Sequence, residues 1–333
     1  MADTSSSPHD AYFKQVMGRP ADIAGELRAV LPEALVARLD WTDLELQPCS
    51  FISQDLASCH SDLLFRTRLN GNDAFVYLLI EHQSRPDPLM AMRMLQYMIA
   101  IWVKYTHDHR GSTELPVVIP LVVHASPRGA RWHTPTAMTD LFRLDSATRD
   151  ALGDLLPRFR FALDDLAAVE LPALYARDLT PAAQILLVLL KVATGNQHLD
   201  RDLLPLLDYL RALLAAPGGM DDLNCVVTYI LTVGETSITD LKPVINQLGP
   251  DAKEVIVTTA ERLRAEGEAR GRAEGEARGR VHVAEILLGQ LAAKFGPVPA
   301  DVALGVRRAG FDQLGLWASR VLNATSLDAV FKD

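Results

Sequence analysis

The chain has 333 residues, of which 49% are hydrophobic and 23% charged, and its net charge is −9. These values exclude a wholly disordered chain and argue against a protein that holds nucleic acid with its entire surface. Its three cysteines, Cys49, Cys59 and Cys225, do not have the spacing of a zinc knuckle or a disulfide framework. The longest apolar run, residues 185–190, is far too short to span a bilayer. We therefore expect a cytoplasmic protein without a membrane segment.

The N-terminal part of the sequence predicts two helices and then a hairpin. Apolar side chains recur at helical spacing within residues 9–39. Strands are expected at residues 44–52, 61–69 and 74–81. Asn70-Gly71 separates the last two apolar runs, and Asn-Gly at such a position is the strongest short hairpin signal.

A long helix, from about Pro88 to His107, follows the hairpin, and residues 115–126 are apolar throughout. The latter pattern is typical of a central strand that is buried on both faces. Beyond about residue 155 the pattern becomes mostly helical.

The sequence RAEGEARG occurs twice, at Arg264–Gly271 and again at Arg272–Gly279. Four Glu–Arg pairs at i,i+4 spacing would stabilise a helix by roughly 1–2 kcal/mol in total. The four glycines cost about 1 kcal/mol each relative to alanine. We therefore expect a helix-prone connector that is not a stable helix by itself. The remaining segment, from residue 281, reads as a small helical unit interrupted by FGPVP.

Polar side chains follow the apolar strand that ends near residue 81. Strand alternation puts Glu81 and Gln83 on one face. Arithmetic on the hairpin, counted outward from the Asn70-Gly71 turn, places Asp62 nearly opposite Glu81. The two positions are offset from exact pairing, and a loop longer than two residues would explain that offset. Two convergent carboxylates suit Mg²⁺, with Mn²⁺ or Ca²⁺ as alternative ions. The same pattern is also what an ordinary solvated strand end presents. A histidine that ends the apolar strand, His124, is more typical of a satisfied strand end than of a metal ligand, and Glu26 is expected on a solvated helix face.

Residues 77–98, YLLIEHQSRPDPLMAMRMLQYM, resemble the recombination-promoting nuclease family, also called the YhgA-like transposases, within the PD-(D/E)XK nuclease superfamily. HDAYFKQVM near the N-terminus and SDLLF at the start of the hairpin match the same pattern. The likeness covers roughly residues 9–260. It implies an α/β, restriction-endonuclease-like core with a mixed sheet flanked by helices, followed by a helical extension, a charged linker and a small C-terminal helical domain.

The resemblance also implies roles for individual residues. Asp62 and Glu81 would bind the metal, and Gln83 would occupy the third catalytic position, where the superfamily normally carries lysine. Arg93 and Tyr97, one turn apart on the long helix, are similar to a Gln and Tyr pair in RecB-like nucleases, so that Arg93 would contact phosphate. The alternative for Tyr97 is that it is a core residue.

These observations predict an Mg²⁺-dependent DNA endonuclease linked to recombination or mobile elements. The alternatives are a catalytically weak, DNA-binding transposase-accessory protein and a protein-interaction scaffold. The expected partner is DNA, with a homodimer formed through residues 261–333 as a further expectation. The expected divisions are residues 1–8 (disordered), 9–170 (nuclease core), 171–260 (helical extension), 261–280 (linker) and 281–333 (C-terminal domain).

Overall fold

The computed structural model describes residues 7–48, 63–81, 86–126 and 129–332, without the side chains of residues 77–81. The chain divides into two compact units, residues 1–259 and 260–333. Among the described helices, none is both long enough and apolar enough to cross a membrane.

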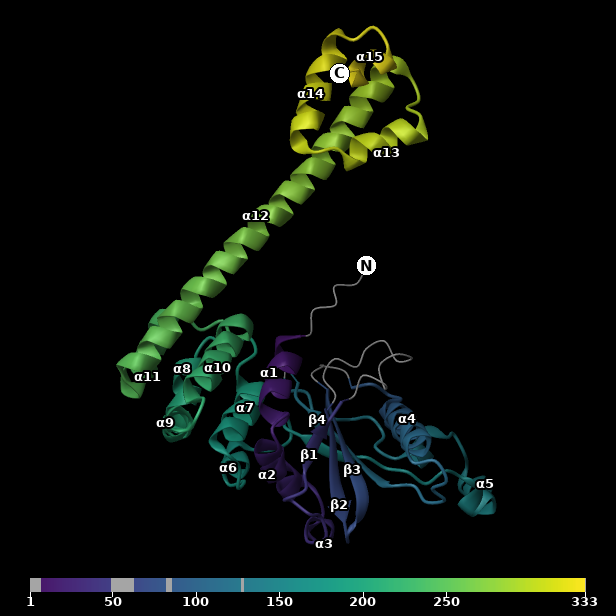
Figure 1. Cartoon of the computed structure of the whole chain (residues 1–333), viewed down its shortest axis with the longest axis vertical. Coiled ribbons are helices and arrows are strands. Elements are labelled where there is room, and N and C mark those ends of the chain that lie inside the picture. Colours follow the sequence, from purple (N-terminus) through teal and green to yellow (C-terminus); the bar gives the residue numbers. More distant parts are fainter. Residues whose placement is uncertain (1–6, 49–62, 82–85, 127–128, 333) are drawn as a thin grey trace. The chain divides into compact units, whose positions relative to one another are not determined.

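A five-stranded mixed sheet forms the centre of the first unit (Figure 1). Its strands are β1 (Glu45–Gln47), β2 (Leu63–Leu69), β3 (Asn72–Glu81), β4 (Val117–His124) and β5 (Ala162–Asp165), in that spatial order. The β1–β2 and β2–β3 pairs are antiparallel, whereas β3–β4 and β4–β5 are parallel. Parallel neighbours need a long crossover connection, and helix α4 (Met90–Asp108) supplies the one between β3 and β4.

Helices make up most of the rest of the chain. Those before α4 are α1 (Pro8–Met17), α2 (Pro20–Val30) and α3 (Glu33–Val36). Those after it, up to residue 248, are α5 (Ser146–Leu152), α6 (Leu171–Tyr175), α7 (Pro181–Val192), α8 (Leu199–Leu203), α9 (Leu207–Ala215), α10 (Gly219–Val233) and α11 (Ile238–Leu248). The last four are α12 (Pro250–Phe295), α13 (Ala300–Arg308), α14 (Phe311–Asn323) and α15 (Leu327–Phe331).

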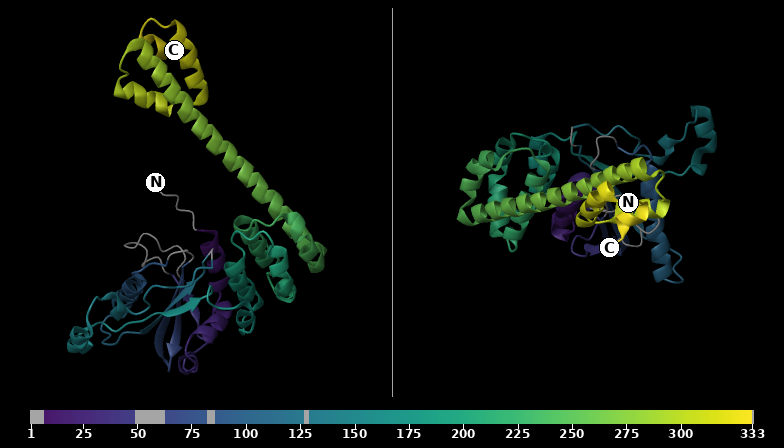
Figure 2. Two further views of the ribbon diagram at one scale, coloured as in Figure 1. Left: turned by 180° about the vertical axis from the view of Figure 1, so that it is seen from behind. Right: turned by 90° about the horizontal axis from the view of Figure 1, so that it is seen from above.

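The central strand β4 is buried on both faces, as its uninterrupted apolar sequence predicted. Val118 and Val122 belong to the cluster that packs under α4, whereas Ile119, Leu121 and Val123 belong to the larger cluster shared with α1, α2 and α7. Figures 1 and 2 show α4 on one side of the sheet and α1 and α2 on the other. The fold is therefore the predicted α/β, restriction-endonuclease-like arrangement, a mixed sheet flanked by helices.

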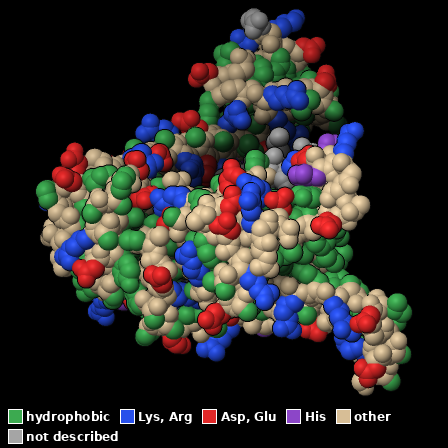
Figure 3. Space-filling view, turned by 60° about the horizontal axis from the view of Figure 1, so that its bottom comes forward, with side chains coloured by type: hydrophobic (Ala, Val, Ile, Leu, Met, Phe, Trp, Pro, Cys, Tyr) green, Lys and Arg blue, Asp and Glu red, His purple; other side chains and the backbone are tan. Residues whose placement is uncertain are grey.

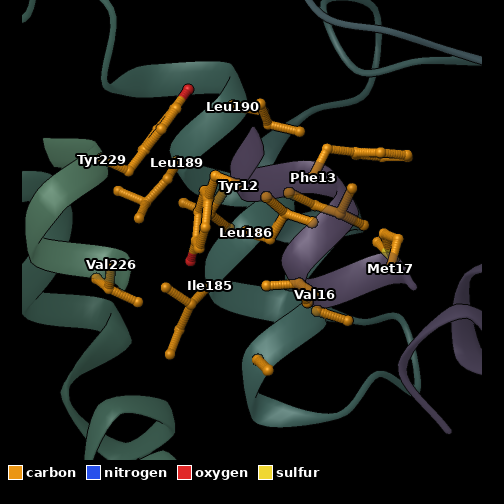
Figure 4. Packing of buried hydrophobic residues seen from close by; sticks show 14 of the residues in the cluster. Tyr12, Phe13, Val16, Met17, Ile185, Leu186, Leu189, Leu190, Val226 and Tyr229 are labelled. Atoms are coloured by element: carbon orange, nitrogen blue, oxygen red, sulfur yellow. The ribbon is translucent and has the colours of Figure 1, made fainter. Parts of the chain in front are cut away.

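The larger core continues from the sheet into the helices that follow it. Tyr12 and Phe13 of α1 pack against α7, and Tyr12 also lies against Tyr229 of α10, with ring centroids 4.8 Å apart (Figure 4). Helix α7 is buried from Ala182 to Leu190, because nearly all its side chains are apolar. Thr180 caps its first turn by accepting a hydrogen bond from the backbone N–H of Ala183. The sheet and the helices after it thus share one continuous core.

The predicted hairpin is confirmed, and its loop contains two residues. Asn70 and Gly71 have φ values of 50° and 84°, the two positive values that a type I′ turn requires. Leu69 pairs with Asn72 directly across the turn, and the register continues to Leu63 with Leu78.

The repeat is helical, as predicted: α12 continues without interruption through Arg264–Gly279 and ends at Phe295. In the second unit, the C-terminal part of α12 and helices α13–α15 enclose a small core that includes Leu291, Val306 and Leu314. Gly296, with φ of 86°, follows the end of α12, so the predicted break at FGPVP is also confirmed.

Candidate active site at the end of the parallel strands

Three parallel strands end at the same edge of the sheet. Glu81, the last residue of β3, is in register with His124, the last residue of β4. His124 is in turn in register with Asp165, the last residue of β5. The carboxyl ends of parallel strands are where α/β folds commonly build ligand sites. This edge, including the backbone at Glu81, is the candidate site.

The structure describes only part of the predicted constellation. Asp62 and Gln83 lie outside the described residues, as does the side chain of Glu81. The hairpin register corrects the sequence arithmetic. That arithmetic paired Asp62 with Glu81 and therefore position 63 with position 80, whereas Leu63 pairs with Leu78. The expected pairing required a loop longer than two residues, whereas the observed turn contains only two.

His124 is completely buried and is held by the neighbouring strand. Its Nδ1 lies 2.8 Å from Oδ1 of Asp165, and the other carboxylate oxygen accepts a hydrogen bond of 2.8 Å from the backbone N–H of Trp132. The Trp132 indole lies edge-on to the imidazole, with the ring centroids 5.3 Å apart. The sequence-based interpretation of His124 as a satisfied strand-end histidine is confirmed.

The preceding residue of β5, Asp164, belongs to a second buried cluster. Arg177 donates two hydrogen bonds of 2.8 Å to the two oxygens of Asp164 and a third, also of 2.8 Å, to Oε2 of Glu26 on α2. Glu26 has no exposed surface and Asp164 is 3% exposed. The expectation that Glu26 lies on a solvated helix face is therefore wrong, because α2 packs against β5.

The two carboxylates of this cluster share a single cation. Burial, followed by the negative charge of Asp164 and a hydrogen bond to it, raises the pKa of Glu26 well above its ordinary range. Burial lowers the pKa of Arg177, but its bonds to Asp164 and Glu26 outweigh that effect and raise it above its ordinary value. The raised pKa favours the neutral, protonated form of Glu26 in a cluster where two carboxyl groups share one guanidinium.

The two predicted residues of α4 contact each other at its N-terminal end. Arg93 pairs with Asp87 at 3.1 Å and donates to the hydroxyl of Tyr97 at 3.4 Å. Asp87 also accepts a hydrogen bond from the backbone N–H of Leu89, which fixes the segment that leads into α4. Tyr97 is 1% exposed and lies in the core cluster under α4, so its ring is a core residue and only its hydroxyl meets a polar partner.

Metal binding at this edge depends on Asp62 and Glu81, whose side chains are not among those that the structure describes. Within residues 7–48, 63–76, 86–126 and 129–332, no three His, Cys, Asp or Glu side chains come together as a metal-binding group. The donor set that the sequence proposes, carboxylate oxygens at the end of a buried strand, has the chemistry that Mg²⁺ prefers.

Comparison with known proteins gives the family. Residues 7–218 match the model of the family described as "Putative transposase, YhgA-like". The chain belongs to this family. The YhgA-like match covers the whole sheet and helices α1–α9, whereas the repeat and the second unit lie beyond it.

Relatives of this YhgA-like chain carry names with different implications. Recombination-promoting nuclease RpnA of Escherichia coli K12 is 31% identical over 85% of this chain and 90% of the relative. Inactive recombination-promoting nuclease-like protein RpnE of the same strain is also 31% identical, over 86% of this chain and 91% of the relative. RpnD of Escherichia coli O157:H7, named a recombination-promoting nuclease, is 29% identical over 78% and 95%. No solved structure matches the chain. Identity alone therefore does not separate active from inactive relatives.

Sequence reasoning missed the polar residues that β5 contributes to the site. It expected mostly helices beyond about residue 155, whereas Ala162–Asp165 form a strand. The signal was present in RFRFALDD, residues 158–165, where Phe159, Phe161 and Leu163 alternate with more polar positions. Recognising that alternation would have placed two consecutive carboxylates at the edge of the parallel strands.

Proposed function

We propose that this chain is an Mg²⁺-dependent DNA endonuclease whose site lies at the carboxyl edge of β3, β4 and β5. The observation that carries the proposal is the register of Glu81 with His124 and Asp165 at that edge, in a fold and family whose relatives include proteins named recombination-promoting nucleases. On the same basis we propose that its biological role lies in DNA recombination.

In this proposal Asp62 and Glu81 hold the metal. A bound Mg²⁺ would lower the pKa of a coordinated water and stabilise negative charge on a phosphate. The protein's part is to present carboxylate oxygens from the end of β3, which is paired with β4 as far as Glu81 and His124. Replacing either residue by alanine should abolish cleavage.

Gln83 would act by positioning, because a carboxamide neither accepts a proton from water at neutral pH nor carries a positive charge. Loss of such positioning typically lowers a rate on the order of 10²-fold. Gln83→Ala should therefore be slow but measurable, and Gln83→Lys should be active if the site has room for the longer cation. Gln83→Ala with the wild-type rate would remove Gln83 from the site.

Arg93 is the proposed phosphate contact. Its planar guanidinium has the donor geometry that suits a phosphate oxygen, and its bonds to Asp87 and Tyr97 hold it at the N-terminal end of α4. In the view of Figure 3, positive and negative side chains are interspersed over the surface. Local contacts of this kind, rather than a uniformly basic surface, would then account for DNA binding in a chain of net charge −9. Arg93→Gln should weaken DNA binding more than it lowers the maximal rate.

The test is cleavage of supercoiled plasmid with Mg²⁺, with EDTA, and with the Asp62→Ala and Glu81→Ala proteins. We expect nicked or linear DNA only with the unmodified chain and Mg²⁺. Cleavage that survives either substitution or EDTA would contradict the proposal.

A catalytically weak DNA-binding protein is the second candidate, and one observation favours it. RpnE, named inactive, is as similar to this chain as RpnA is. DNA binding that Mg²⁺ strengthens, without cleavage of any substrate, would select this candidate.

We also propose that residues 261–333 form a homodimer. Phe311, Gly315, Ala318 and Leu322 share one face of α14, on which Phe311 is 44% and Leu322 74% exposed. In the repeat, pairs of glutamates alternate with pairs of arginines, so a second copy carries complementary charges. Deleting residues 261–333 should lower the mass measured by light scattering by more than half, because the second copy and the deleted residues are both lost. A mass that falls only by the deleted residues would contradict the dimer.

A further inference from the structure

His124 is an unusual residue at its position in the fold. The described positions before it in β4 are apolar, and those from Val118 to Val123 are buried. A buried histidine that is bonded to a carboxylate contributes little net stability compared with an apolar residue of similar size, because both groups must be desolvated. Folding alone therefore does not explain an imidazole at the last position of this strand.

The contacts of Asp165 fix the orientation of the imidazole. The carboxylate accepts from Nδ1 of His124 on one oxygen and from the backbone N–H of Trp132 on the other. Because a carboxylate oxygen accepts hydrogen bonds, Nδ1 is the donor in this contact, and the imidazole ring is held in one orientation. The same carboxylate thereby ties the segment around Trp132 to the ends of β4 and β5.

His124, whose imidazole Asp165 holds, is the neighbour of Glu81 on the adjacent strand. His124 and Glu81 are in parallel register on adjacent strands, whose backbones are about 4.8 Å apart. We propose that His124, held by Asp165, is a positioning residue that fixes the strand end at Glu81 for metal binding. This inference rests on the proposed nuclease function, and nothing in the family match assigns either residue.

The first test separates positioning from general stability by measuring the Mg²⁺ concentration that gives half-maximal cleavage. His124→Ala and Asp165→Asn should raise that concentration by about 10–100-fold, the usual effect of removing a partner that orients a metal ligand. His124→Asn should shift it less than His124→Ala, because the asparagine amide can still donate to Asp165 from near the position of Nδ1. The control is His109→Ala, a histidine beyond the C-terminal end of α4, which should leave the concentration unchanged.

The second measurement does not depend on cleavage. Mn²⁺ is added to the intact protein, and the broadening of histidine ring signals is followed by NMR, with His124 assigned through His124→Asn. Paramagnetic broadening falls steeply with distance, so the His124 signals should disappear before those of His109. This measurement also remains available if His124→Ala does not fold.

The outcomes distinguish the inference from the proposed function. If Mn²⁺ binds and broadens His124 first, but His124→Ala and Asp165→Asn keep the wild-type Mg²⁺ dependence, the positioning role is wrong while the nuclease stands. If Mn²⁺ binds and His124 is among the last signals to broaden, the inference is also wrong. If neither Mn²⁺ nor Mg²⁺ binds and no DNA is cut, the proposed function fails, and the inference fails with it.

Discussion

The carboxyl edge of the sheet and the repeat in α12 contain the same types of charged residue, but in a buried environment at the edge and an exposed one in the repeat. At the edge, Arg177 is joined to the buried carboxylates of Glu26 and Asp164 by hydrogen bonds of 2.8 Å. In the repeat, residues 264–278 are all exposed, and of the four expected pairs in this described stretch the one that forms is Glu274–Arg278, at 3.5 Å. Because water screens exposed charges, we expect each charge at the edge to matter and each charge in the repeat to matter little.

Removing the cation from the buried cluster should have the largest effect on stability. Arg177→Met would leave Asp164 buried without a countercharge, which typically costs about 3–5 kcal/mol. Urea unfolding of the first unit, followed by tyrosine fluorescence, measures the loss. The control is Arg278→Met in the repeat, and equal losses from the two substitutions would break the comparison.

The buried cluster should also make stability depend on pH. The pKa of Glu26 is raised in the folded chain above its ordinary value of 4.5. The folded state therefore binds a proton that the unfolded state releases, so this contribution is fully present below pH 4.5 and is lost as pH rises through the raised pKa. Glu26→Gln should remove it, so that the variant gains stability relative to the unmodified chain as pH rises from 4.5 through the raised pKa of Glu26.

The measurement is the free energy of unfolding at several pH values for the two proteins. A difference between them that stays constant with pH would show that Glu26 titrates normally in the fold. The opposite contribution of His9, whose pKa burial lowers to about 4, is common to both proteins and cancels in the difference.

Glycines in the repeat offer a matched pair of smaller effects. A Cβ added at Gly275 meets no neighbouring atom within 4 Å, whereas one at Gly279 would lie 3.1 Å from the ring of Phe311. Gly275→Ala should stabilise the helix by up to about 1 kcal/mol, and Gly279→Ala should gain less or lose stability. Hydrogen exchange of the backbone amides in residues 264–279 would report both changes. Equal protection in the two variants would mean that Phe311 does not constrain the helix.

A single charge in the repeat should give the smallest effect. Glu274→Gln removes one exposed pair with Arg278 and should cost no more than about 0.5 kcal/mol. The same hydrogen-exchange experiment checks it. A loss comparable to that from Arg177→Met would show that the exposed charges are cooperative.

Sequence patterns predicted the parts of this fold that depend on local signals. The hairpin follows from Asn70-Gly71, the buried strand from the apolar run ending at His124, and the break after α12 from FGPVP. The helical state of the repeat was also predicted, although its glycines cost more than its ion pairs contribute.

What the sequence did not reveal depends on contacts between distant residues. Glu26 and Arg177 are 151 positions apart, and each has an ordinary solvated interpretation until β5 brings Asp164 between them. The short strand β5 lies within a mostly helical part of the sequence, so its alternating pattern, and with it the link between Asp165 and His124, was missed. The expected hairpin offset was wrong because the loop contains only Asn70 and Gly71, so that Leu63 pairs with Leu78.

The most direct test of the nuclease proposal is a Mg²⁺ titration of plasmid cleavage by the unmodified chain and by Glu81→Gln. This substitution keeps the shape of the side chain and removes only its charge, so the fold should be retained. We predict saturable cleavage by the unmodified chain and none by Glu81→Gln at any Mg²⁺ concentration, with equal unfolding midpoints for the two proteins. Cleavage by Glu81→Gln with the same Mg²⁺ dependence would contradict a metal site at this strand end.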